Sequence, residues 1–134
     1  MAVFPSEEWI NQFKDAVNSN VAYEDAARTW EGDFLFVVQP DSTLKQEAVF
    51  YVDLWHGKCR NVSLLRSGES KQTAFIYEGP YANWTKLIRK EIDPIQGLLT
   101  GKFKLKGDML KVLRAVRAAK ELVETAGRVP TEFL

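Results

Sequence analysis

Apolar residues recur at helical spacing near both ends of the chain and at strand spacing between them. The first helical stripe consists of Trp9, Ile10, Phe13, Ala16 and Val17. Ser6 precedes this stripe and two glutamates follow the serine, which is typical of a helix start because the hydroxyl accepts a free backbone N–H and the carboxylates oppose the helix dipole. The pattern predicts a helix that begins after Ser6 and a second, short helix capped by Asn20.

Four segments then change to the period of a strand. They are residues 33–39, 47–57, 58–68 and 72–79. The first, DFLFVVQ, is apolar at successive positions, as expected of a strand that is covered on both faces. Because the connections between the four segments are short, we expect them to pair largely as an antiparallel meander.

The remaining third of the chain returns to helices around one more strand. Pro80 suits the first turn of a helix with Trp84, Leu87 and Ile88 on its apolar side, and Asp93 opens a short helical turn over residues 94–99. The stretch TGKFKLKGDM, residues 100–109, alternates lysines with apolar residues and predicts a fifth strand. One long helix, capped by Asp108, is expected to run to a stop at Gly127. This order predicts an α+β fold in which helices pack on a mixed, mainly antiparallel sheet.

The size and charge of the chain narrow the possible partners. Its 134 residues fit one domain over residues 1–134. Lys and Arg number 18, as do Asp and Glu, so no overall charge would attract nucleic acid and we expect no nucleic-acid partner. No apolar run approaches the roughly 18 residues that span a bilayer, and no secretory leader is visible. We therefore expect a cytoplasmic protein.

Candidate chemistry is sparse. The single histidine, His56, ends a predicted strand, and the single cysteine, Cys59, follows closely. A Cys-His nucleophile pair across a tight turn is one interpretation, and a turn residue beside a structural thiol is the other. One histidine and one cysteine do not supply the soft ligands that zinc needs. We expect no catalytic residues, no metal and no cofactor.

Aromatic residues concentrate on the predicted strands. The set is Trp30, Phe34, Phe36, Phe50, Tyr51, Trp55, Phe75, Tyr77 and Phe103. Such a set either fills a core or lines a cavity between sheet and helices, and composition does not decide between the two.

The block DPIQGLLTGKFKLKGDM, residues 93–109, resembles the C-terminal signature of the sterol carrier protein type 2 family. That signature combines a proline-containing helical turn, Thr/Ser-Gly-Lys, a strand of alternating lysines and Gly-Asp-Met before the last helices. Upstream, TWEGDFLFVV resembles the first strand of the family, and the resemblance extends from Trp9 to Ala126. YVDLWHGKC, residues 51–59, is similar to prokaryotic members that stand alone.

The resemblance implies a five-stranded sheet covered by helices on one face, with an apolar tunnel between the layers. It implies a non-catalytic carrier of a fatty acid, a fatty acyl-CoA, a sterol-like molecule or another lipid. We predict that the tunnel is lined by apolar residues of the C-terminal half: Trp84, Leu87, Leu98, Leu99, Phe103, Leu105, Met109, Leu113 and Val116.

Two further partners follow from the predicted surface. Basic residues on the last helix, Lys111, Arg114, Arg117 and Lys120, are candidates for transient contact with an anionic membrane, or are simply a solvated helix face. The alternative function is a structural module that uses the same apolar surface for a protein partner or a homodimer. An empty apolar tunnel is costly, so we expect ligand binding to move the last helix about Gly107.

Overall fold

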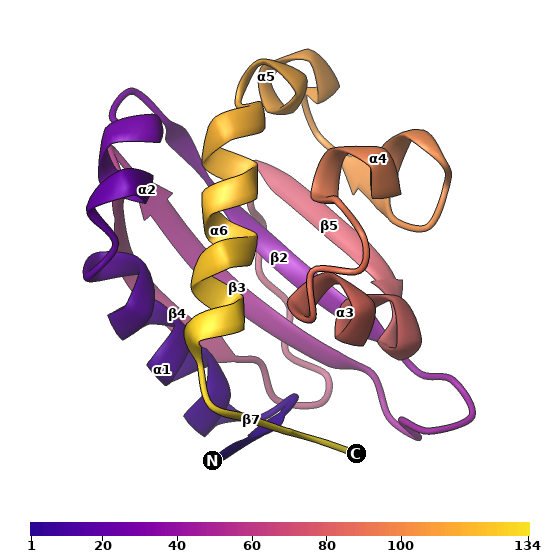
Figure 1. Ribbon diagram of the computed structural model, residues 1–134. Coiled ribbons are helices and arrows are strands. Elements are labelled where there is room, and N and C mark those ends of the chain that lie inside the picture. The colour runs from indigo at the N-terminus through magenta and orange to yellow at the C-terminus, as the bar shows by residue number, and fades with distance from the viewer.

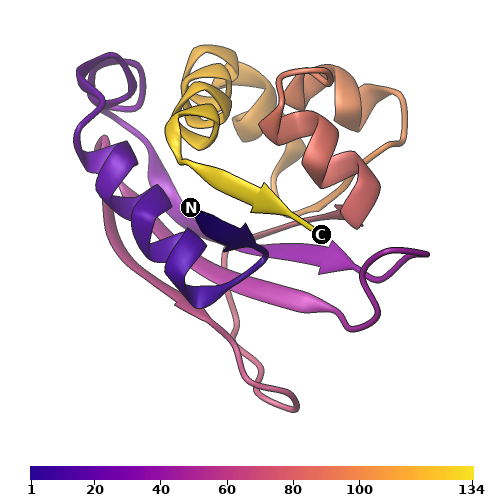
Figure 2. The same ribbon diagram turned by 60° about the horizontal axis from the view of Figure 1, so that its bottom comes forward.

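The computed structural model describes residues 1–134, with six helices on one face of a five-stranded sheet (Figures 1 and 2). The sheet order is β4-β3-β2-β5-β6. Its strands are β2 (Glu31–Gln39), β3 (Ala48–Trp55), β4 (Lys58–Leu64), β5 (Phe75–Pro80) and β6 (Lys104–Lys106). The predicted α+β class and the mixed sheet covered by helices on one face are confirmed.

Of the antiparallel meander predicted for the four central strands, the pairing of the first three is confirmed and that of the fourth is wrong. β2, β3 and β4 pair antiparallel in sequence order, but β5 pairs parallel with β2 on its other edge. β2 is apolar on both faces and lies in the sheet interior, where its second row of N–H and C=O groups needs a partner. These groups form hydrogen bonds with β5, and residues 65–74 form the crossover that carries the chain from β4 to that position.

This crossover contacts the face of the sheet that the helices leave open. Leu65 packs beside a small apolar cluster that includes Tyr51, and the Lys71 ammonium lies 3.8 Å from the centre of the Tyr51 ring. The Ala74 N–H donates to the Asp33 carboxylate at 2.8 Å. The open face is therefore partly covered by the chain itself.

The hairpin between β3 and β4 turns through two residues with positive φ, His56 at 50° and Gly57 at 81°. Two such residues are the requirement of a type I′ turn, which matches the twist of the paired strands. His56 is exposed, and its Nε2 lies 2.5 Å from a carboxylate oxygen of Glu31. His56 is therefore a turn residue, as one of the two interpretations predicted.

The N-terminal helices begin at the predicted caps. In α1 (Glu7–Asn18) the Ser6 hydroxyl accepts the Trp9 N–H, and in α2 (Val21–Ala26) the Asn20 side chain accepts the Tyr23 N–H. The Asn20 amide also donates to the Thr125 hydroxyl at 3.0 Å, with both side chains buried. Asn20 thus fixes α2 against the last helix.

Two short helices follow β5. α3 (Tyr81–Ile88) starts directly after Pro80 and buries Trp84, Leu87 and Ile88, as predicted. α4 (Pro94–Leu99) is capped by Asp93, whose carboxylate accepts two backbone N–H groups. It covers the predicted residues 94–99.

The expected long C-terminal helix is broken in two, which corrects the prediction. α5 (Met109–Arg114) begins at the predicted cap Asp108 and ends at Ala115, and α6 (Val116–Arg128) then crosses the sheet (Figure 1). Gly127 lies inside α6 rather than after it. The helix ends at Arg128 because Val129 precedes Pro130, and a residue before proline is driven out of the helical region.

The two chain ends form a feature that the periodicity did not predict. β1 (Ala2–Phe4) pairs parallel with β7 (Thr131–Phe133) in a separate two-stranded sheet (Figure 2). Ala2 and Phe4 are buried, so this small sheet closes one end of the core.

Candidate functional site

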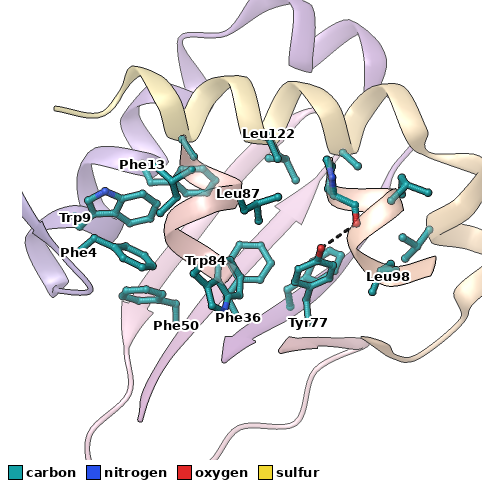
Figure 3. Close-up of a pocket in the computed structure, with 18 residues that line it drawn as sticks. Phe4, Trp9, Phe13, Phe36, Phe50, Tyr77, Trp84, Leu87, Leu98 and Leu122 are labelled. Carbon is teal, nitrogen blue, oxygen red and sulfur yellow. Dashed lines mark hydrogen bonds between the residues drawn. The ribbon is translucent and has the colours of Figure 1, made fainter. Parts of the chain in front are cut away.

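An apolar cavity of about 100 Å³ lies between the sheet and the helices (Figure 3). Of its 18 lining residues, 17 are hydrophobic. The floor comes from the sheet and from β1: Phe34 and Phe36 of β2, Phe50 of β3, Tyr77 of β5 and Phe4. These strand residues face the helices because alternate side chains of a strand point to the same side.

The helices supply the other walls. α1 contributes Trp9 and Phe13, α3 contributes Trp84, Leu87 and Ile88, and α4 contributes Pro94, Ile95 and Leu98. The roof consists of Val112 from α5 and Ala119, Leu122, Val123 and Ala126 from α6. In α1, α3, α4 and α6 the lining residues recur three or four positions apart, which is the spacing of a single helix face.

The polar atoms in these walls are already bonded to the protein. The Tyr77 hydroxyl donates to the Pro94 carbonyl oxygen at 3.0 Å, and the Trp84 Nε1 donates to the Val37 carbonyl oxygen at 2.9 Å. The Trp9 Nε1 donates to the Thr131 hydroxyl at 2.9 Å. Burial raises the pKa of Tyr77, so its hydroxyl keeps its proton. The cavity offers a ligand apolar surface and no free polar anchor.

Three of the predicted site residues line this cavity: Trp84, Leu87 and Leu98. Phe103 is buried one layer behind, with its ring stacked on Tyr77 at 4.7 Å and edge-on to Trp84 at 5.3 Å. Leu105 is half-buried in β6, paired opposite Tyr77. Neither Phe103 nor Leu105 lines the cavity.

The other four predicted residues also lie outside the lining. Leu99 ends α4 and is 63% exposed, because Pro94, Ile95 and Leu98 occupy the inner face of that short helix. Met109 is 38% exposed at the start of α5. Leu113 and Val116 are half-buried against the core on either side of the break at Ala115. That break changes the phase of the helix and brings α6 residues, instead of these two, over the cavity.

Seven of the fifteen lining residues that the prediction missed are aromatic. Phe4, Trp9 and Phe13 come from the N-terminus, where their spacing indicates a buried stripe and nothing more specific. Phe36, Phe50 and Tyr77 belong to the aromatic set that composition left undecided, and they line the cavity. They differ from Tyr51 and Trp55 in pointing to the side of the sheet that the helices cover, and this side is known only once the sheet is folded.

The candidate nucleophile does not lie in this cavity. Cys59 is buried on β4, and burial raises the pKa of its thiol to about 12. His56 is exposed at the turn and bonds to Glu31, not to Cys59. No group of three or more His, Cys, Asp or Glu side chains is arranged to hold a metal ion.

Comparison with known proteins assigns this chain to a family. The sequence model of the SCP-2 sterol transfer family matches residues 10–120. The chain belongs to this family. A crystal structure of sterol carrier protein 2 is 30% identical with a TM-score of 0.82, covering 92% of this chain and 97% of that one. The predicted family resemblance is confirmed.

Other SCP-2 structures agree in fold. A solution structure from Thermus thermophilus, described as possibly a sterol carrier protein, is 29% identical with a TM-score of 0.83, covering 95% of this chain and 90% of that one. The solution structure of a palmitated SCP-2-like protein from Aedes aegypti is 18% identical with a TM-score of 0.60, covering 83% and 90%. Among proteins with curated descriptions, none matches this chain significantly.

Membership in the SCP-2 family supports binding or transfer of lipids or sterols. As for the membrane itself, none of the helices combines the length and the hydropathy needed to cross it.

Proposed function

We propose that this SCP-2 chain is a non-catalytic, cytoplasmic carrier that binds the hydrocarbon part of a lipid in the cavity beneath α6. The observation that carries the proposal is the lining itself, with 17 hydrophobic residues of 18 and the polar atoms of its three polar aromatic side chains bonded within the protein. Apolar surface without a polar anchor favours any chain of suitable length, so we expect broad selectivity.

The same lining supports a carrier without a reaction of its own. General acid–base or nucleophilic chemistry needs a titratable group within reach of the substrate. Tyr77 is the one titratable side chain in the wall, and its hydroxyl is committed to Pro94 with a raised pKa. Cys59 is on β4 outside the lining, with its thiol protonated.

The cavity is smaller than its proposed contents. Pockets for molecules of drug size measure about 300 to 1,000 Å³, whereas this one measures about 100 Å³. A dry void of that size costs only about 2 kcal/mol at roughly 24 cal/mol per Å³, so the protein tolerates it when empty. A long chain must therefore widen the cavity on binding.

The roof is the part of the wall best placed to move. Gly107 has φ of 125° just before α5, and the chain bends again at Ala115 between α5 and α6. α5 is a short helix with Met109 and Leu110 exposed, so few apolar contacts hold its outer side. We propose that α5 and α6 move outward to admit the lipid.

Transient contact with an anionic membrane is a further part of the proposal. Arg117 forms an ion pair with Asp25 at 2.7 Å, and Lys111 donates to a backbone carbonyl, so these two charges are partly committed. Arg114 and Lys120 are exposed beside them. Exposed Leu110 of α5 thus lies on the same surface segment as basic residues of α5 and α6. An apolar residue next to basic ones favours weak, salt-sensitive adsorption of the protein to an anionic membrane.

A chain-length series tests the proposed function. Each buried CH₂ contributes about 0.8 kcal/mol, so affinity for saturated fatty acids should rise about fourfold per added carbon until the cavity is full. Isothermal titration calorimetry with C8 to C16 acids measures this directly. Affinity that did not depend on chain length would contradict binding by the apolar cavity.

A further inference from the structure

A second, polar pocket opens at the surface where α2 and the start of β2 face α5 and α6. Its volume is about 360 Å³. Its walls include Trp30 on one side and Lys111, Arg114 and Ala115 on the other, with Asp108 at the rim of α5. α2 and α5 flank the same end of the molecule (Figure 1). We call this space the basic pocket.

An intermediate space of about 40 Å³ shares lining residues with the basic pocket and, separately, with the apolar cavity. Trp30, Ala115 and Ala118 line both the basic pocket and the intermediate space. Phe34, Val112, Ala119 and Leu122 line both the intermediate space and the apolar cavity. The three spaces therefore form a row from the core to the surface, separated by no more than shared side chains.

The helical side of this row is built from small residues next to the break in the helix. Ala115, Ala118 and Ala119 face it, and Ala115 is the point at which α5 ends and α6 begins. Alanine side chains form a thin wall, and a change of angle at Ala115 alters the gap between α6 and Trp30. A path along this row needs only a small displacement of the roof.

The charge at the outer end is positive and incompletely paired. The half-buried Lys111 lies with its ammonium 4.9 Å from the centre of the Trp30 ring and donates to the Glu31 carbonyl oxygen, but to no carboxylate. Arg114 is exposed and forms no ion pair. The one carboxylate in the lining, Asp108, accepts the Lys111 backbone N–H at 3.2 Å as the cap of α5.

We propose that the basic pocket holds the anionic headgroup of the ligand, a carboxylate or a phosphate, while its acyl chain runs past Trp30 into the apolar cavity. Lys111 and Arg114 would be the headgroup contacts, and Arg114 is the freer of the two. This inference rests on the proposed function and adds to it the place where the headgroup binds and the two side chains that contact it.

Calorimetry on charge-removing variants tests the proposal. The ligands are palmitate, hexadecyl phosphate and the neutral hexadecanol, all with the same chain length. Arg114→Gln should bind palmitate roughly fivefold more weakly, which is the effect of an exposed ion pair of about 1 kcal/mol. Its binding of hexadecanol should not change. The larger loss, with palmitate or with hexadecyl phosphate, identifies whether the pocket favours a carboxylate or a phosphate.

Lys86→Gln is the matched control, because Lys86 is an exposed cation on α3, outside both the basic pocket and the proposed membrane contact. It should leave all three affinities unchanged. Lys111→Gln is the second variant and should weaken the binding of palmitate further when it is combined with Arg114→Gln. Because the Lys111 side chain packs on Trp30, the stability of this variant is measured first. If Lys111→Gln is unstable, the result for Arg114→Gln alone decides whether the proposal holds.

Two results would overturn the inference while leaving the carrier function intact. One is equal affinity of Arg114→Gln and the parent chain for both anionic ligands. The other is an equal loss for palmitate and hexadecanol, which would indicate a structural effect. Absence of binding by all three ligands to the parent chain would instead overturn the proposed function, and this inference with it.

Discussion

The Tyr77 hydroxyl donates a hydrogen bond to the Pro94 carbonyl oxygen at 3.0 Å, across the cavity wall that β5 and α4 share (Figure 3). This bond connects the sheet to a short helix that would otherwise be held by apolar contacts. It also uses the one hydroxyl group of the lining, which is therefore not available to a ligand.

Tyr77→Phe should therefore lower the free energy of unfolding by about 1 kcal/mol, the net contribution of one buried hydrogen bond. Urea denaturation measures this loss. Fatty-acid affinity should stay unchanged, because the hydroxyl is not available to a ligand. If the variant kept its stability but lost fatty-acid binding, Tyr77 would be a polar anchor and the description of the cavity would be wrong.

Filling the cavity should prevent binding without unfolding the protein. Ala119 lines both the apolar cavity and the intermediate space, so Ala119→Leu places three further carbons where the chain is proposed to lie. We expect palmitate affinity to fall by at least tenfold, while stability changes by less than about 1.5 kcal/mol because the added group enters a void.

Ala22→Leu is the matched control for Ala119→Leu, because Ala22 is an exposed helical alanine in α2. It makes the same change away from the cavity and should leave palmitate binding intact. Undiminished binding by Ala119→Leu would place the ligand elsewhere in the molecule.

Movement of the roof has a direct signature in hydrogen exchange. Saturating palmitate should slow amide exchange in α5 and α6, since a chain beneath them replaces missing contacts and restricts opening. The amides of β3 and β4 are the internal reference, because β4 supplies no lining residue and β3 only Phe50. Exchange in α5 and α6 that palmitate left unchanged would contradict the hinge at Gly107.

The Cys59 thiol should be inert in the native protein. With a pKa of about 12, its thiolate fraction at pH 8 is about one in ten thousand, and the side chain is buried. Iodoacetamide should modify it slowly at pH 8 and rapidly after unfolding in urea. His56→Ala and Cys59→Ala should both bind lipid normally. Rapid alkylation of Cys59 in the native protein, or loss of lipid binding in either variant, would favour the interpretation of Cys59 and His56 as a nucleophile pair.

Local signals predicted much of this fold. Ser6, Asn20, Asp93 and Asp108 each cap a helix at the predicted place, because a cap depends on the side chain and its next few residues. The lysines of TGKFKLKGDM are exposed while Phe103 is buried, as the alternation indicates. The regular β6 strand nevertheless covers only Lys104–Lys106, at the sheet edge.

The features that the sequence did not reveal are non-local. The parallel pairing of β5 with β2 depends on which sheet edge is free, and the β1–β7 pair joins the two chain ends. The cavity shows the same limit. Trp84, Leu87 and Leu98 follow from helix faces, but the contributions of Phe4, Phe50 and α6 depend on how distant elements pack and on the break at Ala115.

Native mass spectrometry of freshly purified protein, paired with solvent extraction, tests the central claim most directly. The account predicts a species heavier than the bare chain by the mass of a lipid, the same lipid in the extract, and its displacement by palmitate. Protein that carried no lipid, took up no palmitate and formed a concentration-dependent dimer would contradict the carrier and favour a structural module.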